Sequence, residues 1–378
     1  MTSPTPTSTP GSAQTNLLYT DLEDDLRGGV RGALEQRSPV GQVLARVEQG
    51  QPYDTQLWQT LAGEMGLAGI AIPEAFGGGG ASLREAAVVL EELGRGVAPA
   101  PYLSSAVVAT TALLRLRSVP AVAEALPRLA SGAAIAVLAV PASTSPDGAL
   151  PEVSLVDGRI SGAVAGVADG LTATLLLVPT TDGLYLVDAA ADGVSRTGVV
   201  SLDLTRPLAD LRFHDVTGIR LASTVEGEAA VRAALTAGAA LLASEQLGIA
   251  EWCLTTTVEY LKVRHQFARP VGSFQALKHR MADLWVEQTQ VRAVARYAAA
   301  CAATDDADLP VAASLAQAFC SPAAVHAAEE CVQLHGGIGF TWEHPAHLFL
   351  KRAKADAIIF GTADRHRLRL AGLVNLPA

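Results

Sequence analysis

The stretch YLKVRHQFARPVGSFQALKHRMAD (residues 260–283) decides the fold of the C-terminal third of the chain. Its pattern predicts one helix that ends near Arg264, a loop that contains Pro270 and Gly272, and a second helix capped by Ser273. An arginine and a glutamine beside such a loop, Arg264 and Gln266, suit a diphosphate, which binds best through charge-assisted hydrogen bonds. An inter-helix loop with a solvated charge is the alternative that these residues leave open.

A second segment, QLHGGIGFTWEHP (residues 333–345), carries three glycines within four residues. Glycine permits positive φ angles and lets the backbone approach a ligand closely. The alternative is a plain helix C-cap and turn, for which one glycine would be enough. This segment alone therefore indicates a ligand only weakly.

Working outward from these segments, the chain divides into three regions. Between residues 17 and 129, apolar residues recur at intervals of three and four, which predicts helices. Within this region Ser82 and Glu85 have the spacing of a capping box, so we expect a helix to begin at Leu83. Short apolar runs separated by turns such as Thr181-Asp182-Gly183 predict a β-rich region, and helical patterns return after residue 226 with a break at 305–310. We expect a disordered tail (1–14), an N-terminal helical domain (15–130), a middle β-domain (131–225) and a C-terminal helical domain (226–378).

The composition limits what the protein does. The net charge of −10 argues against a nucleic-acid surface, because such a surface needs basic groups to neutralise phosphates. Apolar stretches such as 229–248 are alanine-rich, and we expect no membrane span. The spacing of the four cysteines suits neither a metal site nor a redox dithiol. We therefore expect reduced cysteines in the core, no metal site and a cytoplasmic location.

Taken together, segments 260–283 and 333–345 closely resemble the C-terminal helical domain of acyl-CoA dehydrogenases. MGLAGIAIPEAFGG (residues 65–78) looks like the N-terminal signature of that family, and LDLTRP (residues 202–207) looks like the end of its β-domain. The resemblance implies an α+β multidomain fold: an N-terminal α-helical domain, a middle β-barrel-like domain and a C-terminal four-helix bundle, assembled as a tetramer.

The resemblance also implies FAD as the cofactor and an acyl-CoA as the substrate. Members of the family remove two hydrogens from adjacent carbons of the thioester: a glutamate takes the α-proton, and the β-hydrogen leaves as hydride to the flavin. The electrons then pass to an electron-transfer flavoprotein or a similar acceptor. Carried over to this chain, the cofactor-binding residues are Arg264, Gln266, Phe267, Phe274, Gln275, Gln333, His335, Gly336, Gly337 and Thr362.

The chain departs from the family at the catalytic base. The family most often places its glutamate directly before a Gly-Thr pair, and here Phe360 precedes Gly361 and Thr362. Some members carry the glutamate on the helix that leads to the arginine segment, and that position falls on Gly238. Glu245 lies on nearly the same helical face and is the candidate replacement, although seven residues correspond to about 10 Å along the axis. The alternative role for Glu245 is a helix-face carboxylate paired with a basic group.

A second departure concerns the flavin ring. Where the family carries a Thr-Glu-Pro-Gly segment, this chain reads VPASTS (residues 140–145), and AVAGV (residues 163–167) offers only small side chains. The chain thus lacks the residues that hold the flavin ring in this family but keeps the motifs that contact the ADP half of FAD. This combination resembles the α2β2 acyl-CoA dehydrogenases of sterol-degrading bacteria, in which one subunit type lacks the base. We therefore expect a sister subunit as the partner. The alternatives are a self-sufficient homotetramer that uses Glu245 and a non-catalytic acyl-CoA-binding or scaffold protein.

Overall fold

The computed structural model describes residues 16–51 and 53–376, and its first region is helical, as expected. Residues 1–14, where the sequence predicts a disordered tail, lie outside the described residues. Helix α4 begins at Leu83 with the predicted capping box, in which the backbone amide of Ser82 donates to Glu85 Oε2 at 2.8 Å. The helices of this region are α1 (Asp21–Arg37), α2 (Val40–Glu48), α3 (Thr55–Trp58), η1 (Gln59–Glu64), η2 (Leu67–Gly69), η3 (Glu74–Phe76), α4 (Leu83–Arg95), η4 (Tyr102–Ala109), α5 (Thr110–Arg115) and α6 (Pro120–Ala130).

Two four-stranded sheets form the middle region, with strand orders β1-β4-β5-β8 and β2-β3-β7-β6. Apolar side chains of both sheets, among them Val137, Leu176, Ile160 and Leu211, form one buried cluster. The predicted turn at Asp182 joins β4 to β5, whose register pairs Thr180 with Gly183. The strands are β1 (Ala136–Leu138), β2 (Ser154–Val156), β3 (Arg159–Ala168), β4 (Leu175–Thr180), β5 (Gly183–Asp188), β6 (Val194–Val199), β7 (Leu208–Val216) and β8 (Ile219–Ala222).

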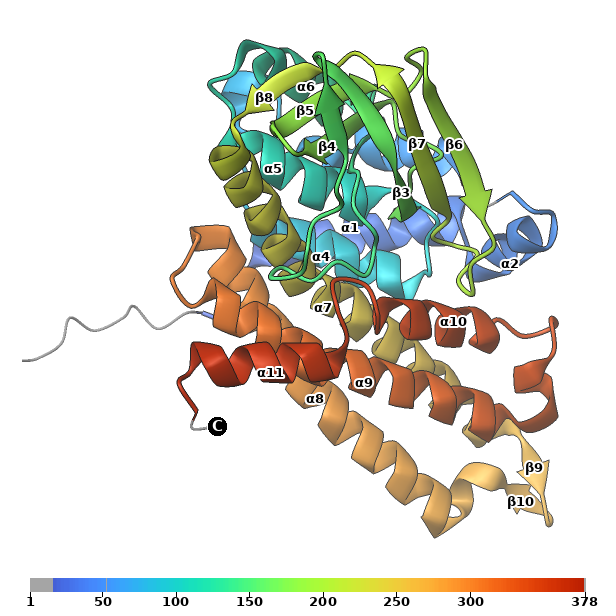
Figure 1. Ribbon diagram of the computed structural model, residues 1–378. Helices are drawn as coiled ribbons and strands as arrows, with labels where there is room; N and C mark the ends of the chain where they lie inside the picture. Colours follow the sequence, from blue (N-terminus) through green and yellow to red (C-terminus); the bar gives the residue numbers. More distant parts are fainter. Residues whose placement is uncertain (1–15, 52, 377–378) are drawn as a thin grey trace, which may run out of the picture.

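The C-terminal region is a helical bundle built on one long helix, α7, which runs for 40 residues. Figure 1 shows α7 passing from the sheets at the top of the molecule into the bundle below. The predicted break at 305–310 is present, because α8 ends at Thr304 and Asp305 adopts a left-handed conformation before α9 begins. The elements are α7 (Thr224–Val263), β9 (His265–Gln266), β10 (Arg269–Pro270), η5 (Val271–Ser273), α8 (Gln275–Thr304), α9 (Leu309–His335), η6 (Gly336–Phe340), α10 (Ala346–Asp356) and α11 (Ala363–Leu373).

The start of α8 corrects one expectation. Its N-cap is Phe274, and no side chain caps it, so the prediction that Ser273 caps this helix is wrong. Ser273 instead closes the short 3-10 helix η5, which places its hydroxyl one residue too early to reach the first free amides of α8. The predicted end of the preceding helix is confirmed, since α7 ends at Val263 with Arg264 as its C-cap.

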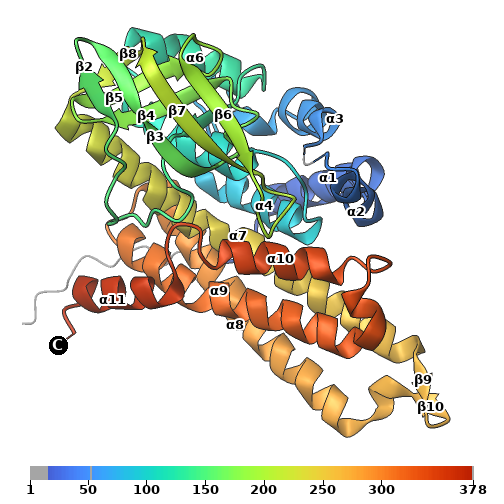
Figure 2. The same cartoon turned by 45° about the vertical axis from the view of Figure 1, so that its right-hand side comes forward.

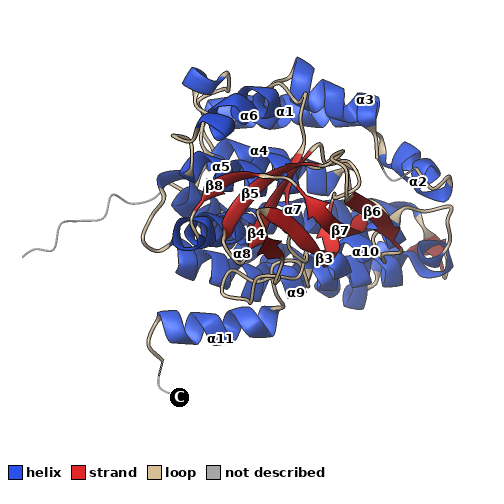
Figure 3. Ribbon diagram, turned by 45° about the horizontal axis from the view of Figure 1, so that its top comes forward, coloured by secondary structure: helices blue, strands red, loops and turns tan. Residues whose placement is uncertain are grey.

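Two helices, α7 and the segment Leu309–Phe340, are long and apolar enough to cross a membrane by length and composition. Within the fold, 94% of the most apolar window of α7 and 61% of that of the second segment are buried. Burial of this kind is typical of core helices, whose apolar surface is covered by their neighbours. Figure 3 shows α7 enclosed by the sheets and by the other helices.

The four cysteines are free and buried, as the sequence predicts. Within residues 16–51 and 53–376, no three histidine, cysteine or acidic side chains gather in a group that could hold a metal ion.

Candidate functional site

A groove of about 860 Å³ lies at the far end of the C-terminal bundle, where α7 ends, α8 begins and α9 gives way to η6. It brings together most of the residues predicted to bind the cofactor, although they come from two distant segments of the sequence. These are Arg264, Gln266, Phe267, Phe274, Gln333, His335, Gly336 and Gly337. Figure 2 shows this end of the bundle, with the β9–β10 hairpin projecting beyond the helices.

Arg264 is held by its backbone, and its side chain pairs with no group among the described residues. Its amide donates to the Tyr260 carbonyl at 2.9 Å, and its own carbonyl accepts from the Val271 amide at 2.7 Å. These two bonds close the loop onto the end of α7. A guanidinium presented in this way can donate a fork of N–H groups to a diphosphate.

His335 lines the same groove with one nitrogen unpaired. Its Nδ1 lies 2.7 Å from the Cys331 carbonyl oxygen, which makes Nδ1 the donor, and its ring stacks on Tyr260 with centroids 4.5 Å apart. Burial opposes the charged ring, but the hydrogen bonds with Cys331 raise the pKa of His335 above its usual value. Nε2 is buried and has no hydrogen-bond partner in the described residues.

The glycines give the groove an open floor. Gly336 has φ +64°, a conformation that favours glycine, and a β-carbon built on Gly336 or Gly337 would meet no atom within 4 Å. The space above both residues is therefore available to a cofactor.

Two predicted cofactor residues lie outside this groove. Gln275 is exposed on the first turn of α8, and Thr362 is the N-cap of α11, where its hydroxyl accepts from the Arg365 amide. Sequence reasoning missed Arg280 and Tyr260, which line the groove. Both lie within the stretch 260–283, but only the fold shows that they face the same side as Arg264.

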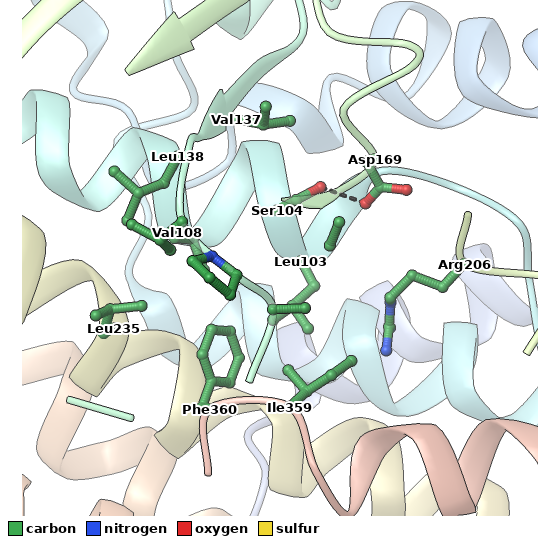
Figure 4. Close-up of a pocket in the computed structure, with 14 residues that line it drawn as sticks. Leu103, Ser104, Val108, Val137, Leu138, Asp169, Arg206, Leu235, Ile359 and Phe360 are labelled. Carbon is green, nitrogen blue, oxygen red and sulfur yellow. Dashed lines mark hydrogen bonds between the residues drawn. The ribbon is translucent and has the colours of Figure 1, made fainter. Parts of the chain in front are cut away.

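A second site, a cavity of only about 40 Å³, lies between the middle sheets and the loop after α10. Figure 4 shows Phe360 and Ile359 entering it from that loop, opposite Val137 and Leu138. A β-carbon built on Gly238 would lie 2.7 Å from Cζ of Phe360, so the two base positions of the family meet at one point. Because one water needs about 10–15 Å³ of such volume, this cavity holds only a few waters and is too small for a bulky acyl chain.

The polar side of this cavity is already paired. Asp169 accepts from the Tyr53 hydroxyl at 2.9 Å and from the Ser104 hydroxyl, and burial raises the pKa of its carboxyl. Arg206 lines the same side, as Figure 4 shows. Both carboxylate oxygens of Asp169 are thus engaged by hydroxyl donors.

Glu245 is buried behind the cavity in a cluster of ion pairs. Its carboxylate accepts from Arg206 Nη2 at 2.6 Å and from Arg352 Nη1 at 2.6 Å. Arg206 also pairs with Asp356 at 2.5 Å, and Arg352 pairs with Asp203 at 2.7 Å. Although burial opposes the charge, the two arginines lower the pKa of Glu245. Both oxygens are thus engaged as ion-pair acceptors, which is the structural role that the sequence left as the alternative to a catalytic base.

The family models agree with this geometry. The pattern described as "Acyl-CoA dehydrogenase, N-terminal domain" matches residues 20–133, and "Acyl-CoA dehydrogenase, C-terminal domain" matches residues 226–373. The chain belongs to the acyl-CoA dehydrogenase family. Among curated members, acyl-CoA dehydrogenase IpdE2 of Mycobacterium tuberculosis is 37% identical over 88% of this chain and 91% of its own length.

Solved structures of acyl-CoA dehydrogenases share the whole fold. A variant of the Tcur3481-Tcur3483 steroid ACAD has a TM-score of 0.82 and 32% identity, covering 94% of this chain and 98% of its own. The ChsE4-ChsE5 complex from Mycobacterium tuberculosis has a TM-score of 0.84 and 27% identity, covering 96% of this chain and 100% of its own.

FAD is the cofactor of the acyl-CoA dehydrogenase family, and this chain fits one half of it. The open groove suits the ADP half, as does the guanidinium of Arg264, which pairs with no group among the described residues. The cavity around Phe360, by contrast, is small and lined mostly by apolar side chains.

Proposed function

We propose that this chain is the base-lacking subunit of a heteromeric, FAD-dependent acyl-CoA dehydrogenase. In this assembly the chain binds the ADP half of FAD, and a sister acyl-CoA dehydrogenase subunit supplies the catalytic glutamate and the acyl-binding cavity. The observation that carries the proposal is the contact between Gly238 and Phe360, which occupies both base positions with groups that accept no proton.

The same contact excludes the substrate from this chain. Phe360 is 7% exposed, and its backbone amide donates to the Ala142 carbonyl at 2.9 Å. Its carbonyl oxygen lies 2.9 Å from His366 Nε2, which holds the loop from the other side. The backbone of this loop is thus held on both sides with the Phe360 ring buried in the cavity, where it takes the space of a thioester.

The residues of the groove act on the cofactor through charge and shape. Arg264 and Gln266 donate to the diphosphate, and the bare backbone at Gly336 and Gly337 allows the ADP to lie close against η6. When bound, FAD supplies a hydride acceptor for the oxidation of adjacent C–H bonds. The electrons leave for an electron-transfer flavoprotein or a similar acceptor.

The substrate class in this proposal is a bulky, steroid-derived acyl-CoA. It is supported by the likeness to a solved steroid ACAD, which shares 32% of its residues with this chain over nearly the full length of both.

Visible absorbance of purified protein tests the assembly. We expect the chain expressed alone to carry little flavin and to oxidise no acyl-CoA, and we expect co-expression with a glutamate-bearing sister subunit to restore both. A full flavin complement and turnover by the chain alone would instead identify a self-sufficient homotetramer. Absence of flavin under every condition would identify an acyl-CoA-binding or scaffold protein.

A further inference from the structure

Strand β6 is an open edge of the sheet with strand order β2-β3-β7-β6, and Figures 1 and 2 show it as the outermost strand on its side. Its residues pair with β7, and no other helix or strand of the described chain makes extensive contact with it. The backbone of residues 195–199 makes no backbone hydrogen bond outside the pair with β7 among the described residues. Because alternate backbone groups of an edge strand point away from its neighbour, β6 offers a row of amides and carbonyls to a further strand.

This edge lacks the usual protection. The other edge strands of the two four-stranded sheets, β1, β2 and β8, have three, three and four residues, whereas β6 has six. The register of β6 with β7 is continuous, whereas the β3–β7 and β5–β8 pairs contain register shifts. Proteins usually protect an edge with a lysine, a proline, a bulge or a covering segment, and β6 contains neither lysine nor proline.

The single charged side chain of β6 is turned away from solvent. Nη1 of Arg196 donates to three backbone carbonyls of the loop 170–173, the shortest bond being 2.8 Å. Val194 lies on the same face and packs against the apolar cluster between the sheets. The opposite face is uncharged and exposed, and it carries Ser195, Thr197 and Val199.

Apolar side chains are exposed where β6 ends. Val199 is 38% exposed, Val200 is 97% exposed and Leu202 is 59% exposed. An apolar run beside an open strand edge favours association, since a second strand would cover both the backbone groups and these side chains.

A second copy of β6 fits this edge. A two-fold pair of identical antiparallel strands is centred on a residue that lies opposite itself, because directly opposed side chains share a face. Centring on Arg196 would pair residues 194–198, and centring on Thr197 would pair residues 195–199. The first register sets two arginines against each other, and like charges directly opposite are destabilising, whereas two opposed threonines are a favourable pair. The second register also places Val199 opposite Ser195 of the other copy.

We infer that β6 pairs with β6 of a second copy of this chain about a two-fold axis at Thr197, which joins the two four-stranded sheets into one. A strand pair of this length buries less surface than the roughly 1,200–2,000 Å² of a stable interface, so the contact is weak and depends on concentration. It uses no residue of the flavin groove or of the cavity around Phe360. It is therefore independent of the proposed function.

Cross-linking of single cysteines in the full chain tests this contact alone, whatever other contacts the chain makes. The native cysteines are buried. We expect Thr197→Cys to be joined to a second copy by a short bismaleimide, with a yield that rises with protein concentration. Ser154→Cys is the matched control, because Ser154 is exposed on β2 at the other edge of the same sheet, and it should not cross-link above the parent. Ser195→Cys mixed with Val199→Cys should form the mixed product in preference to either self product.

Charge then tests the strength of the pair. Thr197→Lys should weaken self-association several-fold in sedimentation experiments, because two lysines would lie opposite each other, and mixing it with Thr197→Glu should restore the parental value. Ser154→Lys should associate as the parent does, and thermal melting checks that each variant is folded. If a lysine variant does not fold, the cross-linking result decides alone.

Three outcomes would overturn the inference. The first is a Thr197→Cys yield no higher than that of Ser154→Cys. The second is equal self and mixed cross-linking of Ser195→Cys and Val199→Cys, which would show that the register is wrong. The third is cross-linking of Thr197→Cys to a co-expressed sister subunit in place of a second copy of this chain.

Discussion

The Cζ atom of Phe360 lies 2.7 Å from the point where a β-carbon of Gly238 would stand, so the ring in this position is compatible only with glycine at 238. Phe360 needs a glycine opposite it, and any larger side chain on α7 at this point would displace the ring. The two positions at which the family places its glutamate are therefore closed by a single packing contact. The consequences of this contact and of the intact groove can be measured separately.

Truncation of the ring tests whether the cavity takes part in turnover. We expect Phe360→Ala to lower the free energy of unfolding by about 3–5 kcal/mol, because a buried aromatic ring is lost. In the co-expressed complex, turnover per bound flavin should remain at the parental value, since the reacting groups belong to the sister subunit. Melting curves and flavin-normalised rates measure the two effects. A large loss of rate at full flavin occupancy would place the reaction in this chain.

Removal of the groove arginine tests cofactor capture. Arg264→Ala in the complex should cause severe flavin loss on dialysis, because charge-assisted hydrogen bonds to a diphosphate are worth about 1.5–3 kcal/mol each. Lys262→Ala is the control: it removes a positive charge from the last turn of the same helix, where Lys262 pairs only with the exposed Glu259. Equal flavin retention by both variants would show that the segment is a connector.

The two glycines of η6 should respond differently to substitution. Gly336→Val places a branched side chain at φ +64°, which costs about 1–3 kcal/mol of stability, and it should also reduce flavin binding. A side chain at Gly337 meets no strain and no neighbour in the chain, so Gly337→Val should keep the parental melting temperature and still obstruct the groove. Flavin content and melting temperature are the readouts, and a Gly337→Val variant with full flavin would disprove the role of the turn.

Glu245→Gln distinguishes a structural carboxylate from a catalytic one. Breaking a buried ion pair on one side costs about 3–5 kcal/mol, because Arg206 and Arg352 would each lose one of their buried carboxylate partners and keep only Asp356 and Asp203. We expect a large fall in melting temperature for Glu245→Gln. The control Glu228→Gln breaks an exposed pair with Arg232 and should lower the free energy of unfolding by only about 0.5 kcal/mol or less. Normal melting together with abolished turnover would instead establish Glu245 as the base.

Asp356 should make stability depend on pH. Burial and the Glu245 carboxylate raise the pKa of Asp356 to about 8, so the folded protein holds a proton that the unfolded chain releases near pH 4. The contribution of this proton to the free energy of unfolding is complete below pH 4. It is lost as the pH rises toward 8, by at most about 1.4 kcal/mol per pH unit. Unfolding between pH 5 and 9 should show this fall, and Asp356→Asn should remove it. An equal slope in the variant would contradict the assignment.

The residues predicted to bind FAD come together in one groove, although they lie in two separate segments. Arg264, Gln266 and the glycines at 336 and 337 are close in sequence to the helix ends that position them, so local patterns locate both. The helix start at Leu83 is predicted for the same reason, since a capping box is a local interaction.

The sequence does not predict the closure of the cavity. Gly238 and Phe360 each appear as an isolated substitution, and only the packing of α7 against the loop after α10 shows that they touch. The partners of Glu245 are hidden in the same way, because Arg206 lies in the loop between β6 and β7 and Arg352 lies on α10. Long-range contacts of this kind depend on the tertiary fold, which helical periodicity does not encode.

No residue lines both the groove and the filled cavity. After duplication of an ancestral gene, substitutions that abolish catalysis in one copy would leave its hold on the nucleotide intact. Under the proposed function, such a copy would still be selected for through its twin, whose cofactor it would help to retain. The spatial separation of the two sites thus gives a simple route by which one enzyme gene becomes two that are each indispensable.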